Sequence, residues 1–155
     1  MNSKICTKEE AVEIMRHDSA TVITGSFDIM HLGHMRFIAK AKVADPSNVL
    51  FVIVLSDDAI RERKGQGRPF FKQAERAEFL TYLKDVDYVL PWPGKWQDLR
   101  KFLTEARPKL LVVNDSDEGI DNKREVMESI GGEVVVQKRV GNHSTSRIIE
   151  AIGDL

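Results

Sequence analysis

Apolar residues along the chain follow two alternating patterns, short continuous runs and runs with helical spacing. Five segments rich in β-branched and aliphatic residues have the length of buried strands: 20–24, 48–55, 85–90, 109–114 and 133–137. Apolar side chains recur with helical spacing over 32–44, 72–84, 97–106 and 122–130 and from Ser144 onward. Continuous apolar strands that alternate with helices are typical of βαβ units. The pattern therefore predicts an α/β fold, a Rossmann-like doubly wound parallel sheet of about five strands flanked by helices.

Two segments outside this alternation carry their own signals. Thr7 and Glu10 have the spacing of a capping box, which predicts a short amphipathic helix over 8–17 before the core. The polar, glycine-containing segment RERKGQGRPF, residues 61–70, is predicted to be a loop. With 155 residues, the chain is expected to form a single domain over 1–155 with a sizeable core.

The composition is that of an ordinary globular protein, with 42% hydrophobic and 30% charged residues. Lys and Arg total 23 against 24 acidic residues, so nothing in the overall charge indicates nucleic acid or a membrane surface as a partner. Any attraction for an anion must therefore be local. The longest apolar run, VLFVIVL at 49–55, is too short to span a bilayer. Because the first residues lack the apolar stretch of a signal peptide and Cys6 is the single cysteine, a cytoplasmic location is expected.

The segment TGSFDIMHLGHMRF, residues 24–37, places His31 and His34 where the first predicted strand passes into a helix. Ligands of parallel sheets bind at this edge, and backbone N–H groups at a helix start form an anion site. Gly33 removes a side chain where a phosphate chain would approach the backbone. Capping or surface histidines are the alternative interpretation. A metal site is not expected, because no Cys, Asp or Glu lies at ligand spacing beside the pair.

Four stretches of the chain resemble the cytidylyltransferase-like nucleotidyltransferases, over about residues 20–152. GSFDIMHLGHMRFIAKAK, which begins at Gly25, is similar to the signature that contains the HxGH motif of this family. KGQGRPFFKQAERAEFLTYLKDVDYVL at 64–90 and GGEVVV at 131–136 resemble the nucleotidyltransferase domain of ADP-heptose synthases. RVGNHSTSRII at 139–149 looks like a motif shared by choline-phosphate, ethanolamine-phosphate and glycerol-3-phosphate cytidylyltransferases.

The resemblance implies an enzyme that transfers CMP or AMP from CTP or ATP to the phosphate or phosphonate of a small substrate, releasing pyrophosphate with Mg²⁺. His31 and His34 would hold the triphosphate and stabilise the transition state, and Lys64 would bridge the two phosphate-bearing reactants. The attacking phosphate oxygen is already ionised near neutral pH, so positioning and charge neutralisation are expected to supply the catalysis. A nucleotide-binding or sensing module without catalysis is the alternative function.

Further roles are assigned to residues at the same predicted edge. The nucleotide-binding residues are expected to be Thr24, Gly25, Ser26, Phe27, Gly33, Asp115, Arg139, Ser144, Thr145 and Ser146. The substrate-binding residues are expected to be Asp28, Lys64 and Trp96. Simpler roles stay open: Asp28 as a helix cap that orients its loop, Asp115 as part of a polar loop, and Trp96 as a packed loop anchor. Arg68 and Arg76 serve either the phosphate chain or local acids.

The chain departs from the family pattern at two places. Residues 114–117 read NDSD where the heptose enzymes have KGGDY, and His143 replaces the usual isoleucine of the last motif. These departures leave CTP and ATP open as the nucleotide, and a sugar phosphate or a phospho-alcohol open as the acceptor. Members of the family often form homodimers, so a homodimer is the expected assembly, with or without a contribution from the helix at 8–17.

Overall fold

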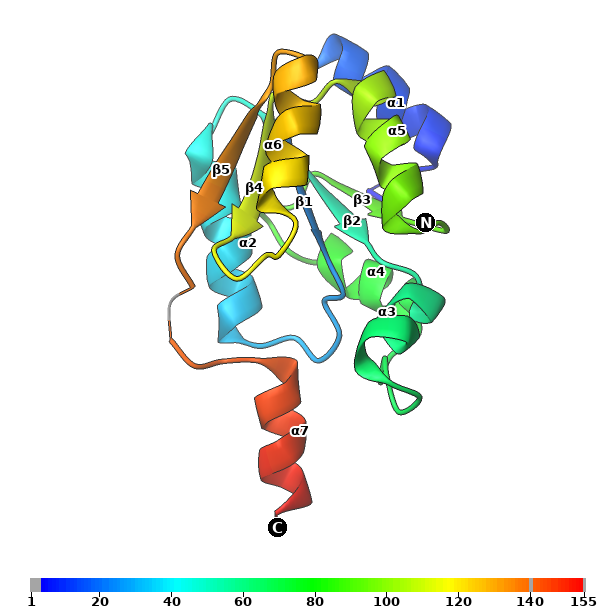
Figure 1. Ribbon diagram of the computed structural model, residues 1–155, viewed down its shortest axis with the longest axis vertical. Helices are drawn as coiled ribbons and strands as arrows, with labels where there is room; N and C mark the ends of the chain where they lie inside the picture. Colours follow the sequence, from blue (N-terminus) through cyan, green and yellow to red (C-terminus); the bar gives the residue numbers. More distant parts are fainter. Residues whose placement is uncertain (1–3, 140, 155) are drawn as a thin grey trace.

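The computed structural model describes residues 4–139 and 141–154, and its centre is a five-stranded parallel sheet (Figure 1). The strands are β1 (Ala20–Gly25), β2 (Val49–Val54), β3 (Tyr88–Pro91), β4 (Leu110–Asn114) and β5 (Glu133–Gln137). Their order is β3-β2-β1-β4-β5, and every neighbouring pair is parallel. The chain therefore leaves the central strand β1 first toward one edge and then toward the other, which confirms the predicted Rossmann-like, doubly wound architecture.

Seven helices accompany the sheet in the described part of the chain. They are α1 (Lys8–His17), α2 (Leu32–Ala44), α3 (Asp57–Lys64), α4 (Gln73–Thr81), α5 (Trp96–Ala106), α6 (Ile120–Ser129) and α7 (Thr145–Gly153). One hydrophobic core joins one face of the sheet to α1, α5 and α6, and a second joins the other face to α2 and α4. Helix α7 projects away from both layers (Figure 1). None of the helices, over the residues described, is long and apolar enough to cross a membrane.

Local signals in the sequence account for the ends of several elements. The capping box of Thr7 and Glu10 is present at α1, with both hydrogen bonds formed. Strand β5 has the predicted bounds, whereas α4 is shorter than predicted and β3 begins three residues later, at Tyr88. Such shifts are common, because apolar spacing marks the middle of an element better than its ends.

Helix α3 corrects the prediction that residues 61–70 form a loop for residues 61–64, which belong to the helix, whereas residues 65–70 lie outside any helix or strand. The helix begins after Ser56, whose hydroxyl accepts the N–H of Ala59, and ends at Gly65, which has a φ of 96°. Ile60 is the one buried residue of this fully described helix. Because the remaining side chains stay at least partly exposed, the segment has no apolar stripe by which its sequence could reveal a helix.

Candidate active site

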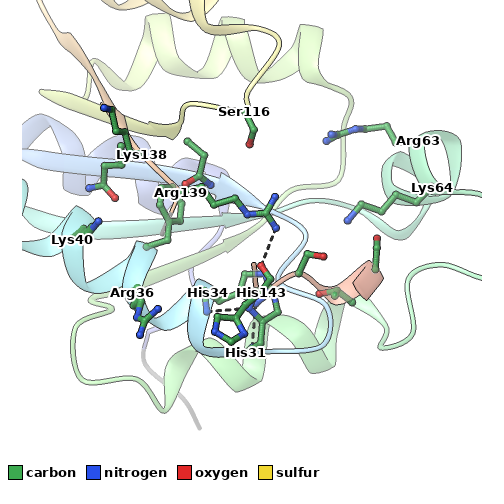
Figure 2. Close-up of a pocket in the computed structure, with 17 residues that line it drawn as sticks. His31, His34, Arg36, Lys40, Arg63, Lys64, Ser116, Lys138, Arg139 and His143 are labelled. Carbon is green, nitrogen blue, oxygen red and sulfur yellow. Dashed lines mark hydrogen bonds between the residues drawn. The ribbon is translucent and has the colours of Figure 1, made fainter. Parts of the chain in front are cut away.

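A cavity of about 320 Å³ lies at the carboxyl ends of β4 and β5, between α2, α3 and the start of α7 (Figure 2). Six of the lining residues are Lys or Arg, three are His, and none of those described is Asp or Glu. The lining residues are His31, Gly33, His34, Arg36, Phe37, Lys40, Arg63, Lys64, Asn114, Ser116, Gln137, Lys138, Arg139, His143, Ser144, Thr145 and Ser146. In a chain with a net charge of -1, this is a local concentration of positive charge that fits an anionic ligand.

The two histidines of the HxGH motif are fixed by hydrogen bonds at the start of α2. His31 is the N-cap, and its Nδ1 accepts the N–H of Gly33 at 3.0 Å. The Nδ1 of His34 accepts the N–H of His31 at 3.4 Å, and the two ring centroids lie 3.9 Å apart. Because both Nδ1 atoms accept, a neutral ring carries its proton on Nε2 in each case. Capping by His31 therefore leaves a second nitrogen free to donate to a ligand.

The electrostatics of the cavity keep these imidazoles neutral. Burial, reinforced by His31 and Lys64, lowers the pKa of His34 from 6.5 to about 3. Burial, followed by the charges of His143 and Arg139, also lowers the pKa of His31. The pKa of Lys64 is lowered by burial and then by Arg68 and Arg63. All three shifts arise first from burial and then from neighbouring positive charge, and a bound phosphate chain would offset the second of these causes.

Gly33 is required by its protein neighbours as well as by any ligand. A Cβ at this position would lie 2.8 Å from Cε1 of His31 and 3.3 Å from the carbonyl oxygen of His143. A side chain there would therefore displace the capping ring and the segment that leads into α7.

Asp28 holds the loop that follows Lys64, and it does not cap α2. Its buried carboxylate accepts the N–H groups of Phe70 and Phe71 at 2.8 and 2.9 Å, and Nε of Arg68 lies 3.4 Å away. The expectation of a helix cap at Asp28 is wrong because His31 occupies the N-cap. The orienting role applies to a loop about forty residues away in sequence, which no local pattern reveals.

The two arginines after α3 also tie loops together. Arg76 is buried, donates to the carbonyl oxygens of Ser26 and Leu55, and pairs with Asp57 at 2.7 Å. Of the two roles left open for it, the structure shows pairing with a local acid. Arg68 links Asp28 to the hydroxyl of Ser146, which it contacts at 3.3 Å.

The hydroxyls that open α7 each have a separate partner. The Oγ of Ser144 accepts the N–H of Arg147 at 3.1 Å and caps the helix. Thr145 donates to the carbonyl oxygen of Ile29 at 3.1 Å, and Ser146 contacts Arg68. All three nevertheless line the cavity, at the end of the helix where the first backbone N–H groups have no partner within the helix. The start of α7 is thus fastened to two loops of the sheet edge.

Arg139 closes this side of the cavity. Its Nη2 donates to the carbonyl oxygen of His143 at 2.8 Å, drawn as a dashed line in Figure 2. Its backbone N–H donates to Asp115 at 3.3 Å, so Asp115 holds the strand exit and is not itself a lining residue. The structure therefore brings Arg139 together with the HxGH histidines, as the sequence predicts. Asp115 contacts the backbone of Arg139 outside the cavity lining.

The residues at the end of β1 lie next to the histidines and outside the lining group. Thr24 and Gly25 end the strand, and Ser26 and Phe27 follow it. The buried ring of Phe27 packs 5.5 Å from that of His34, centroid to centroid, on a backbone with a φ of 47°. A Cβ on Gly25 would meet this ring at 2.9 Å. These residues shape the turn that aims the imidazoles.

Trp96 is separated from the lining residues. It packs against the hydrophobic core between the sheet and α5 and α6, and Nζ of Lys123 lies 4.6 Å from the centroid of its ring. Lys123 in turn is paired with Asp117 in the loop after β4. This arrangement matches the packed anchor that was the alternative to substrate contact.

Several lining residues were not predicted from the sequence. Figure 2 shows Arg63 on the Lys64 side of the cavity, and Arg36, Lys40 and Lys138 on the opposite side. The spacing from Gly33 to Arg36 and Lys40 is helical, so these two could have been found once the helix was placed. The other lining residues outside the prediction are Phe37, Asn114, Ser116, Gln137 and His143.

A doubly wound sheet with two imidazoles, a lysine and a helix N-terminus around a cationic cavity fits a class of protein that binds phosphate chains. The chain belongs to the cytidylyltransferase-like family, whose model matches residues 22–151. The expected family is thereby confirmed.

Individual relatives agree with this assignment. The chain is 36% identical over 148 residues to "Bifunctional protein HldE" of Photobacterium profundum, covering 93% of this chain and 30% of the relative. It is 36% identical over 158 residues to the protein of the same name from Campylobacter curvus, covering 97% of this chain and 31% of that one. The chain therefore spans less than a third of these curated relatives.

Solved structures show the same fold. The crystal structure of the lipopolysaccharide core biosynthesis protein from Thermoplasma volcanium matches with a TM-score of 0.64 and 24% identity, covering 81% of this chain and 99% of that one. Pantoate-beta-alanine ligase from Francisella tularensis matches with a TM-score of 0.64 and 14% identity, covering 92% of this chain and 68% of that one.

Proposed function

We propose that the chain transfers CMP or AMP from CTP or ATP to the phosphate of a small phosphorylated substrate and releases pyrophosphate. The observation that carries this proposal is the arrangement of two neutral imidazoles, each with a free Nε2–H, in a cavity lined by cations. A non-catalytic nucleotide-binding module is the competing function, and it does not require donors arranged in this way around a reacting group.

In the proposed reaction, an oxygen of the acceptor phosphate attacks the α-phosphorus of the nucleotide. The bond from that phosphorus to the oxygen it shares with the β-phosphorus breaks, and pyrophosphate leaves. His31 and His34 donate to the oxygens on which charge develops, without reorganising during the reaction. Lys64 reduces the repulsion between the two anionic reactants, and Arg139 with the start of α7 holds the departing phosphates. No general base is needed, because the acceptor oxygen is already ionised.

We propose that Mg²⁺ enters with the nucleoside triphosphate. Carboxylates are the protein ligands Mg²⁺ prefers, and none lines the cavity among the described residues. A group of three His, Cys, Asp or Glu side chains that could hold a metal is likewise not found in the part of the chain that the structure describes. The ligands of the ion would thus be phosphate oxygens and water, with the protein cations around that complex.

The acceptor is proposed to be a sugar phosphate, with a phospho-alcohol as the second choice. Two findings support the first: the relatives named HldE, which the sequence resembles in the stretch expected of ADP-heptose synthases, and the neighbour named as a lipopolysaccharide core biosynthesis protein. Contacts of Asp28 and Trp96 with this substrate remain predictions.

We further propose that the chain acts as one nucleotidyltransferase domain in the cytoplasm and as a homodimer. The dimer is supported by the family resemblance and by Phe79 and Tyr82, large apolar side chains that remain 50% and 74% exposed at α4. Light scattering coupled to size-exclusion chromatography tests the dimer directly, and a monomeric mass at all concentrations contradicts it.

The transferase is tested by pyrophosphate release from CTP, ATP, GTP and UTP, each with a panel of sugar phosphates and phospho-alcohols. We expect release with at least one pair, and a loss of about a thousandfold in His31→Ala and His34→Ala with the fold retained by circular dichroism. His17→Ala is the matched control, because His17 is exposed and pairs with Glu13 on α1. Unchanged turnover in both site variants refutes the mechanism, and nucleotide binding without release across the panel favours the binding module.

A further inference from the structure

On the side of the cavity opposite Lys64, the lining includes neutral groups at the last residues of two adjacent strands, beside Lys40 and Lys138. Asn114 ends β4 and Gln137 ends β5, and the two are paired in the parallel register. Both line the cavity, together with Phe37 of α2. The imidazoles, Lys64 and the start of α7 suit a phosphate chain, whereas two amides beside an aromatic ring suit a planar, uncharged heterocycle.

The direction of the Gln137 side chain follows from the alternation along β5. Val134 and Val136 pack against the core that contains α6, whereas Val135 packs against the core that contains α2. Because side chains alternate between the faces of a strand, Gln137 projects on the same side as Val135. It therefore stands over α2, where Phe37 also packs.

The side-chain oxygen of Gln137 lacks a hydrogen-bond partner. Three buried side-chain atoms in the described residues are unpartnered: Oδ1 of Asn48, Nη2 of Arg68 and Oε1 of Gln137. Of these residues, Gln137 is the one that lines the cavity. A buried acceptor without a donor is costly, so a ligand that supplies an N–H at this place gains free energy that the protein alone lacks.

We propose that Gln137 reads the base of the nucleotide and selects bases whose Watson–Crick edge carries an amino group beside an accepting ring nitrogen. Adenine and cytosine have this edge, a donor next to an acceptor. The amide of Gln137 offers the complement, with Oε1 accepting from the amino group and Nε2 donating to the ring nitrogen. Guanine and uracil carry a carbonyl oxygen in place of that amino group. With the amide oriented as in the structure, this leaves Oε1 unpaired and opposes two donors and two acceptors, and pairing requires the amide to turn over by 180°. Lys40 and Lys138 line the cavity as well, but an ammonium has no acceptor to offer to a base amino group.

This inference rests on the proposed function for the identity of the ligand as a nucleoside triphosphate, so binding and turnover are measured separately. Calorimetric titration of the intact chain is expected to show ATP and CTP bound at least about tenfold more tightly than GTP and UTP, about 1.4 kcal/mol. Gln137→Met keeps the length of the side chain without the amide and is expected to bring this ratio close to one. Gln97→Met, an exposed change on α5, is the control and retains the wild-type ratio.

Two results overturn the assignment. One is that the wild-type protein binds the four nucleotides equally. The other is that the Gln137→Met variant, shown to be folded by a cooperative thermal denaturation, keeps the full preference for ATP and CTP. Pyrophosphate release is then assayed on the same proteins. If the base preference vanishes in the variant and no acceptor supports turnover, the role of Gln137 in recognising the base is upheld and the transferase activity is refuted. Turnover without any base preference upholds the transferase activity and refutes the role of Gln137 in recognising the base.

Discussion

Acidification should destabilise this protein through His34, by an amount that can be worked out from its environment. The pKa of His34 falls from an ordinary value of 6.5 to about 3 in the folded chain, mainly through burial. Between these two values the unfolded chain binds more protons than the folded one. The free energy of unfolding therefore falls as the pH drops below 6.5, and it goes on falling until about pH 3.

The magnitude follows from the width of that interval. At about pH 7.5 His34 is neutral in both states and contributes nothing to the pH dependence. About pH 5 is about 1.5 pH units below the ordinary pKa of histidine, so His34 is protonated in the unfolded chain and neutral in the folded one. Each pH unit corresponds to about 1.4 kcal/mol, so the free energy of unfolding is expected to fall by about 2 kcal/mol. This is a large share of the stability of a domain of ordinary size.

Urea denaturation at the two pH values measures the effect, with His34→Gln as the matched variant. The glutamine amide oxygen can still accept the N–H of His31, so the local cap is preserved while the titrating group is removed. Wild-type protein should lose about 2 kcal/mol more than the variant between about pH 7.5 and about pH 5. Equal losses in the two proteins would show that burial does not lower the pKa of His34 in the folded chain.

Three further changes test other parts of the site. Asp28→Asn should lower the free energy of unfolding by about 2 kcal/mol, because a charged acceptor of two backbone N–H groups is lost, and urea denaturation that shows no change contradicts this. Arg76→Met should cost about 3 kcal/mol or more in the same assay, since it leaves buried carbonyl oxygens and Asp57 unpaired, and a neutral effect is evidence against the tie. Lys64→Ala should lower kcat/KM about a hundredfold in the pyrophosphate assay. Lys101→Ala, on the exposed side of α5, is the control and should leave kcat/KM unchanged. Equal effects of the two changes would contradict the bridging role of Lys64.

Local patterns in the sequence were enough to predict the strands of the sheet and the position of the HxGH histidines. The run at 133–137 became β5 with the same bounds, because its three valines pack alternately against the two cores on either side of the sheet. The HxGH segment was placed at a strand-to-helix turn, because its glycine and flanking apolar residues have a local meaning. The dual use of His31 as N-cap and cavity lining also depends on neighbours within three residues.

What escaped prediction depends on contacts that are distant in sequence or absent from the core. Helix α3 buries Ile60 alone among its described residues, so its sequence looks like a polar loop. The partners of Asp28 are Phe70 and Phe71, and nothing near residue 28 announces them. Gln137 belongs to none of the motifs found in the sequence. Its side-chain oxygen lacks a hydrogen-bond donor, and only the folded structure shows this.

The attachment of α7 has a consequence for the order in which this protein is made. The five strands are complete at Gln137, and the wall formed by Arg139 and the hydroxyls at 144–146 follows them along the chain. On the ribosome, the sheet can therefore assemble before the segment that fastens onto Ile29 and Arg68 has emerged. A nascent chain at that stage has its sheet but lacks one side of the cavity, so the candidate active site is completed after the fold that carries it.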